Sequence, residues 1–297
     1  MKHTTLALAA LITLATAPAC GASLAPLPTV KIALVAPFEG RFAAVGYEAF
    51  PAMRIALREQ IAAGGIGGFQ VEFVAYNDNA DPVQAARMAR NVVLDESVVA
   101  VIGHYRLDTT LAALAVYTQA GLPLVAPGVP ADLLPESPVL FRMGAPIARL
   151  RAPESCRIDN DLRQDILAVL PDLQSGGVQR LFAARVAGKC FATDAPFPRD
   201  WPAARRALAT FPDVSGGFQP GPRSITAYDA TRLILSALQA EARSGRQPGR
   251  AELAHALRAA THAGLLGPIQ FDPQGRMVDP PVWVYRFDQS GEPVLVR

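Results

Sequence analysis

The sequence has little charge and almost no excess of either sign. Charged residues make up 18% of its 297 positions, and 28 basic side chains against 26 acidic ones leave a formal net charge of +2. Proteins that bind the phosphate backbone of nucleic acids concentrate Lys and Arg on one face. The even balance therefore predicts no nucleic-acid partner. Because 51% of the residues are hydrophobic, intrinsic disorder is also excluded.

The motifs of common catalytic and cofactor sites are absent as well. The sequence contains no GxSxG, no GxxxxGKS/T, no HExxH, and no GxGxxG after its first apolar strand. It has no CxxC, and no His stands near a Cys at the spacing of metal ligands. The glycines of 64–68 fall between a helix pattern and a strand pattern, which indicates a helix end. We therefore expect neither an enzyme nor a cofactor or metal site.

Long apolar runs are missing after the N-terminus, so the rest of the chain does not predict a membrane span. The N-terminus combines Lys2 with an apolar stretch over 6–17 and the small residues Ala17-Pro18-Ala19, a pattern that predicts a signal peptide over 1–19. Cys20 then leaves two interpretations. The exported protein is either lipidated at Cys20 and anchored to the membrane, or a soluble periplasmic protein that begins with Cys.

Only three cysteines occur, and removal of the signal peptide leaves Cys156 and Cys190 beyond Cys20. An oxidising compartment allows a disulfide between Cys156 and Cys190. Two separate thiols are the alternative, because sequence spacing does not give the Cα separation.

Strand and helix patterns alternate along the first half of the chain. Apolar strand patterns cover 30–36, 69–75, 98–102 and 122–126, and helix patterns cover 47–63, 82–95 and 108–119. The second half is less regular, with helix patterns over 224–243 and 250–261 and short strand patterns over 269–271, 282–287 and 294–296.

Such alternation predicts an α/β fold in which a parallel sheet is covered by helices on both faces. Ligands of such sheets bind beyond the carboxyl ends of the strands. The loops at 37–45, 104–109 and 126–132 are therefore expected to converge on one crevice.

The order of several segments resembles a known family. VKIALVAPFEGRFAAVGYEA, REQIAAGGIGGFQVEFVAYNDNADPVQAARMARNVV, VVAVIGH, AGLPLVAPGVPADL and LFRMGAP follow one another as in the first lobe of type I periplasmic binding proteins of the leucine/isoleucine/valine-binding class. Later, SITAYDATRLILSAL, GLLGPIQFDPQGR and VWVYRF resemble the family's late helix and its GxxxFDxxG segment.

The resemblance implies a two-lobed, periplasmic-binding-protein-like I fold, each lobe a parallel sheet flanked by helices. Lobe 1 would span 30–143 plus 224–266, and a shortened lobe 2 would span 144–223 plus 267–297. It also implies an extracytoplasmic component of an ABC importer of the branched-chain amino acid type, which binds an amino acid or a small anionic or polar solute and delivers it to an ABC permease. A receptor or sensor, or a degenerate binding protein that no longer binds solute, remains an alternative.

Position by position, the family's amino acid clamp is altered. Its hydroxyl residue falls at Leu107, its Ala at Gly128, its Thr at Pro130 and its aromatic wall at Val45. Pro130 offers neither a hydroxyl nor an N–H to a carboxylate. Asp172 falls at the second-lobe carboxylate that meets the ligand ammonium, although Asp is also common in a turn of this kind.

Other residues of the same loops are replacement candidates. Arg106 and Arg41 would pair with an anionic solute, or else point to water. Asp108 and Thr109 begin a helix whose N–H groups suit an oxyanion, although capping alone explains them. His104 either titrates at the crevice or has a structural role.

Overall fold

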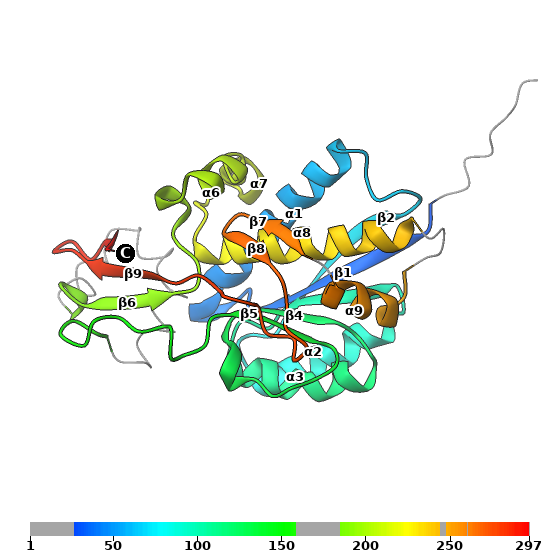
Figure 1. Cartoon of the computed structure of the whole chain (residues 1–297), viewed down its shortest axis with the longest axis horizontal. Helices are drawn as coiled ribbons and strands as arrows, with labels where there is room; N and C mark the ends of the chain where they lie inside the picture. Colours follow the sequence, from blue (N-terminus) through cyan, green and yellow to red (C-terminus); the bar gives the residue numbers. More distant parts are fainter. Residues whose placement is uncertain (1–26, 159–184, 244–247, 260, 297) are drawn as a thin grey trace, which may run out of the picture.

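The computed structural model describes residues 27–158, 185–243, 248–259 and 261–296, which form a large and a small part (Figure 1). The predicted signal peptide, Cys20 and Asp172 lie outside these residues. No helix within the described ranges has the length and apolar character needed to cross a lipid bilayer.

The large part is built around a five-stranded sheet whose strands lie in the order β2-β1-β3-β4-β5. All neighbouring strands pair in parallel. The strands are β1 (Thr29–Ala36), β2 (Gln70–Asn77), β3 (Val98–Gly103), β4 (Leu124–Pro130) and β5 (Leu140–Gly144). Because β2 lies on one side of β1 and the later strands lie on the other, the connections leaving β1 and β3 diverge. A ligand crevice is expected where they separate.

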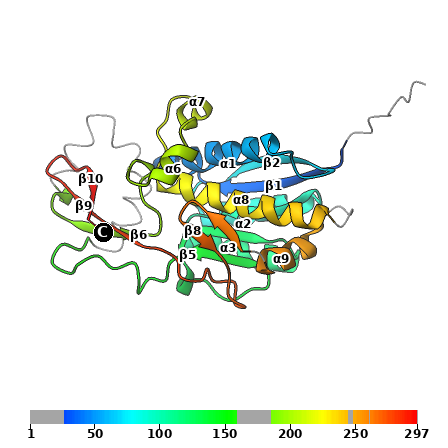
Figure 2. The ribbon, with the colours of Figure 1, turned by 45° about the horizontal axis from the view of Figure 1, so that its top comes forward.

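Helices cover both faces of this sheet, as the sequence predicts (Figure 2). Side chains alternate along β1, so that Ile32 and Leu34 pack in one core while Ala33 and Val35 pack in the other. The first core contains α1 (Ala44–Ala62), α8 (Pro222–Ala242) and α9 (Arg250–Ala259). The second contains α2 (Pro82–Leu94) and α3 (Leu107–Gln119).

Local chemistry sets several helix ends. The Asp81 carboxylate accepts a hydrogen bond of 2.7 Å from the backbone N–H of Gln84, and Pro82 occupies the first turn, so the predicted start of α2 is confirmed. At the other end of α1, Gly64 and Gly65 have positive φ values, which helix residues do not adopt. These two glycines end the helix, as the sequence indicates.

The small part differs from the expected parallel sheet. In the described residues its sheet is β10-β9-β6, and both pairings are antiparallel. The strands are β6 (Cys190–Thr193), β9 (Trp283–Phe287) and β10 (Pro293–Leu295). A short turn joins β9 to β10, and a connection this short allows only antiparallel neighbours. The prediction of a parallel sheet is therefore confirmed for the large part and wrong for these three strands.

A disulfide joins the small part internally. Cys156 and Cys190 are bonded, with 5.1 Å between their Cα atoms. Cys190 also donates a backbone hydrogen bond to the carbonyl of Cys156. Of the two alternatives that the sequence leaves open, the structure has the disulfide.

Two segments assigned by sequence to lobe 2 pack on the large part instead. The first forms α6 (Pro202–Ala207) and α7 (Phe211–Ser215), and its Leu208 and Phe211 lie in the core beneath α1 and α8. The second contains β8 (Gly267–Ile269), which pairs with β7 (His262–Gly264). These contacts place 202–215 and 267–278 with the large part, because their apolar side chains are buried there and not against β6 or β9.

A buried carboxyl on α8 gives the protein a specific pH dependence. Asp229 is 1% exposed, and its Oδ1 accepts a 2.8 Å hydrogen bond from the backbone N–H of Leu265. Burial raises the pKa of Asp229 to about 7, against the opposing effect of the backbone N–H groups of Leu265 and Leu266. The folded protein therefore retains a proton there that the unfolded chain releases near pH 4.

We expect Asp229→Asn to remove this dependence. Asp229 contributes stability that is present in full below about pH 4 and is lost as the pH rises to about 7. Above pH 7 the variant should exceed the wild type in free energy of unfolding by a few kcal/mol, because an amide carries no buried charge. Urea unfolding of both proteins at pH 4.5, 6 and 8 tests this; a constant difference across the three pH values would contradict it.

Candidate functional site

A small cavity lies at the carboxyl ends of β1, β3 and β4. It has a volume of about 30 Å³, enough for one or two water-sized groups. Its lining comes from all three loops expected to converge, so that prediction is confirmed. The lining residues are Pro37, Phe42, Val45, Tyr105, Arg106, Gly128 and Arg223.

Arg223, in the first turn of α8, places its guanidinium against Gly128. A Cβ on Gly128 would lie 1.8 Å from Nη1 of Arg223, so only glycine leaves room for this side chain. The Arg223 side chain is 11% exposed, and its guanidinium makes no hydrogen bond to any described residue. Its charged neighbour is Asp194, which follows β6 in the small part, with Oδ1 at 3.8 Å from Nη1. Arg223 thus joins the two parts electrostatically while its N–H donors stay unused within the described protein.

The backbone of Arg223 is held by Glu48, a 3% exposed residue of α1. A carboxylate oxygen of Glu48 accepts a 2.9 Å hydrogen bond from the Arg223 N–H. The hydroxyl of Ser224 donates to the carbonyl of Glu48 at 3.1 Å. These bonds fix the start of α8 beside α1, and a carboxylate at a helix N-terminus is also favoured by the helix dipole.

Tyr105 contributes a second donor without a partner. Its hydroxyl is buried and has no hydrogen-bond partner in the part of the chain that the structure describes. Burial raises the pKa of Tyr105, and the nearby Glu48 adds to this while Arg223 opposes it. The hydroxyl is therefore protonated at neutral pH and suited to donate to an acceptor in the cavity.

Arg106 lines the cavity but already has a carboxylate partner. Its Nε and Nη2 atoms donate to the two oxygens of Asp108 at 3.2 and 3.1 Å. Its guanidinium lies 4.5 Å from the centre of the Phe42 ring, and that of Arg41 lies at the same distance from this ring. Phe42 thus has two cationic neighbours, an arrangement that holds the loop after β1 close to the loop after β3.

His104 lies in the core and not at the crevice, so its prediction as a ligand-binding residue is wrong. Its side chain is fully buried. Its Nδ1 lies 2.8 Å from Oδ2 of Asp78, and its Nε2 lies 3.2 Å from the hydroxyl of Tyr117. With both ring nitrogens hydrogen-bonded, the structural alternative explains this residue fully.

Two buried tyrosines, Tyr117 and Tyr105, should respond differently when their hydroxyl is removed. Tyr117→Phe should lower the free energy of unfolding by about 1–2 kcal/mol, because His104 loses a buried hydrogen-bond partner. Tyr105→Phe should leave it unchanged or raise it by about 1 kcal/mol, because its hydroxyl is buried without a partner. Urea unfolding measures both. Equal losses in the two variants would mean that Tyr105 has a partner in solution.

The remaining predicted residues have mainly structural contacts. Leu107, the first residue of α3, is half-buried and packs against the core that contains α2 and α3. The hydroxyl of Thr109 donates to the carbonyl of Arg106 at 3.1 Å, so it stabilises the first turn of α3. Pro130 is buried at the end of β4, where it pairs with Gly144. None of these three lines the cavity, whereas Gly128 does.

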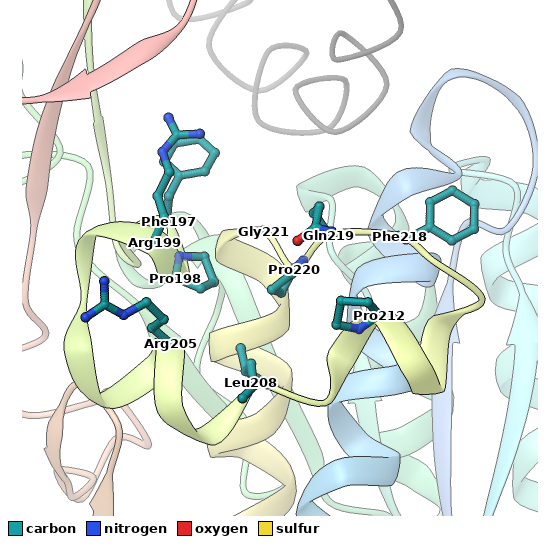
Figure 3. Close-up of a pocket in the computed structure, with 11 residues that line it drawn as sticks. Phe197, Pro198, Arg199, Arg205, Leu208, Pro212, Phe218, Gln219, Pro220 and Gly221 are labelled. Atoms are coloured by element: carbon teal, nitrogen blue, oxygen red, sulfur yellow. The ribbon is translucent and has the colours of Figure 1, made fainter.

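A larger cavity of about 460 Å³ lies between α6, α7 and the segment that precedes α8 (Figure 3). Leu208, Pro212 and Pro220 give it apolar walls, and the Arg199 guanidinium stacks 4.9 Å from the centre of the Phe197 ring at its rim. No strand of the five-stranded sheet ends there, so the topology favours the small cavity as the recognition site. Among the described residues, no group of three or more His, Cys, Asp or Glu side chains is placed to hold a metal ion.

The sequence patterns do not identify Arg223, Tyr105 or Asp194 as site residues. Tyr105 lies between the candidates His104 and Arg106 in a loop that is expected to face the crevice. Its position in the sequence was therefore sufficient to make it a candidate as well. Arg223 directly precedes the predicted helix of 224–243, and nothing local indicates that its side chain is buried. Asp194 follows a short strand whose end is set only by pairing with β9.

The segment that builds the five-stranded sheet is similar in sequence to a known family. Residues 29–149 match the family model described as periplasmic binding protein. The expected resemblance is thus confirmed for the segment that builds the five-stranded sheet.

Particular proteins share this likeness. An amino acid binding protein of Pseudomonas aeruginosa is 31% identical over 118 residues, 40% of this chain and 32% of the relative. A leucine-, isoleucine-, valine-, threonine- and alanine-binding protein of the same organism is 35% identical over 103 residues, 35% and 27% of the two chains. These matches span about a third of the relatives' length.

The crystal structure of LivJ, the branched-chain amino acid transporter substrate binding protein from Streptococcus pneumoniae, in complex with isoleucine, resembles nearly the whole fold. Its TM-score is 0.71 at 18% identity, covering 90% of this chain and 99% of that one. The predicted α/β fold with a parallel sheet flanked by helices is confirmed for the large part. The relatives are named as binding proteins, in agreement with the expectation of no enzyme.

Proposed function

We propose that this protein is an extracytoplasmic solute-binding component of an ABC importer of the branched-chain amino acid type. It holds a small solute between the large and small parts. Support comes from the sequence match over 29–149, from relatives named for amino acid binding, and from the predicted signal peptide. An ABC permease in the membrane is the proposed partner, and the periplasm or the membrane surface, with lipidation at Cys20, is the proposed location.

One observation carries the proposal most directly. The donor-rich cavity lies at the carboxyl ends of β1, β3 and β4, and Asp194 of the small part has its Oδ1 3.8 Å from Nη1 of Arg223, which lines the cavity. A solute bound there contacts the large part directly and lies beside the ion pair of Arg223 and Asp194. Its differential affinity for the closed arrangement would shift the equilibrium between open and closed forms.

Thermal unfolding with a broad panel tests the proposal. The panel contains amino acids, small carboxylates, amides and short peptides. A solute at 100 times its dissociation constant should add about 2.7 kcal/mol to the free energy of unfolding. Absence of any shift across the panel would favour the degenerate binding protein over the importer component.

A further inference from the structure

We infer that Arg223 and Tyr105 form an anion receptor, and that the solute is a small carboxylate without an α-ammonium group. This inference rests on the proposed function and names its solute class. It starts from the imbalance between hydrogen-bond donors and acceptors at the cavity.

The cavity has more hydrogen-bond donors than acceptors within hydrogen-bond distance of them. A guanidinium carries five N–H donors, and that of Arg223 has none of them hydrogen-bonded within the described protein, since Asp194 at 3.8 Å lies beyond hydrogen-bond distance. Tyr105 lines the same cavity, and its hydroxyl is buried without a partner in the described protein. A buried hydroxyl is costly to leave unpaired. The Tyr105 hydroxyl and the unused donors of Arg223, beside one cavity, indicate a site built for an acceptor.

The size and polarity of the cavity favour a carboxylate group as that acceptor. About 30 Å³ accommodates one small group and not a whole solute. A carboxylate offers two oxygens, so it is able to accept from the guanidinium and from the Tyr105 hydroxyl at once. Phe42 and Val45 provide apolar contacts along the same cavity. The carboxylate end of a solute would therefore bind against Arg223.

The same surroundings disfavour an ammonium group. Glu48 accepts from the Arg223 N–H, Asp108 accepts from both nitrogens of Arg106, and Asp194 is paired with the Arg223 guanidinium. An ammonium would have to break one of these pairings and would also meet the charge of Arg223. For a zwitterionic amino acid, the unfavourable binding free energy of the ammonium thus offsets the favourable binding free energy of the carboxylate.

Matched compounds separate these contributions. The probes are propanoate, 4-methylpentanoate and phenylacetate, each with its amide and with the amino acid that adds only an α-ammonium: alanine, leucine and phenylglycine. Titration calorimetry on the full chain should show at least one carboxylate that binds at least tenfold more tightly than its amide and its amino acid. Arg223→Gln should weaken that carboxylate at least 100-fold, and Tyr105→Phe about tenfold.

Arg206→Gln is the matched control, because Arg206 is exposed on α6 and does not line the cavity. It should leave carboxylate affinity unchanged. Tyr105→Phe is a second test of the proposal in case Arg223→Gln does not fold, because it removes only one oxygen that has no partner. Both variants are compared with the wild type by circular dichroism.

Each outcome has a definite meaning. A carboxylate preference that depends on Arg223 and Tyr105 supports the receptor. An amino acid or amide that binds as tightly as its carboxylate overturns the inference and leaves the proposed function intact. Carboxylate affinity that is unchanged in Arg223→Gln also overturns it. Failure of all nine compounds overturns it too, and the broad thermal panel then decides the proposed function separately.

Discussion

Gly128→Ala should abolish solute binding and destabilise the protein. The new Cβ would lie 1.8 Å from Nη1 of Arg223, so the guanidinium has to leave its position. Gly128 also has φ +81°, a left-handed conformation that costs alanine about 1–2 kcal/mol. Overpacking adds about 1–3 kcal/mol. Urea unfolding should show a loss of about 2–5 kcal/mol, and affinity for any solute that binds the wild type should fall at least 100-fold.

Gly121→Ala isolates the contribution of backbone strain. Gly121 follows α3 with φ +62°, and its added Cβ would have no atom within 4 Å. This variant should lose about 1 kcal/mol of stability and keep its solute affinity. Equal losses of solute affinity in Gly128→Ala and Gly121→Ala would contradict the prediction, because only Gly128 makes room for the Arg223 side chain.

Loss of the disulfide should unfold the small part first. The Cys156–Cys190 bond closes a loop with a sequence separation of 34, for which chain entropy predicts a stabilisation of about 4 kcal/mol. The Cys156→Ser, Cys190→Ser double variant removes it without leaving a thiol in this region. Because Trp283 is buried in β9 and packs against Trp201, tryptophan fluorescence should shift to longer wavelength at a lower urea concentration than in the wild type.

Unfolding of the small part and unfolding of the large part are measured by different signals. Circular dichroism reports mainly the helices of the large part, whose cores do not include either cysteine. The circular dichroism signal should therefore retain most of its amplitude at urea concentrations where tryptophan fluorescence has already changed. Coincident transitions at the wild-type midpoint would show that the disulfide contributes no stability.

The sequence was sufficient for the parts of the fold that local patterns determine. Asp81-Pro82 predicts the start of α2, and the apolar runs of β1 and β3 predict buried parallel strands. Because the carboxyl ends of parallel strands meet at one edge, the convergence of the three loops follows as well. These predictions depend only on chain-local chemistry and on a general rule of topology.

Tertiary contacts determine what the sequence did not predict. The burial of Arg223 depends on the absence of a side chain at Gly128, 95 positions away in the chain. The structural role of His104 depends on Asp78 and Tyr117, which lie on either side of it in sequence. Likewise, the packing of 202–215 on the large part depends on core positions of α1 and α8 that no pattern within the segment indicates.

Within the described residues the chain passes between the two parts at three places, and each contains proline. These are Ala145-Pro146, Ala195-Pro196 and Pro280-Pro281. Proline fixes its own φ near −65° and restricts the residue before it. Few backbone bonds remain to take up a rotation. We therefore expect stiff hinges, so that the small part swings through a narrow angle and solute exchange requires only a slight parting of Asp194 from Arg223.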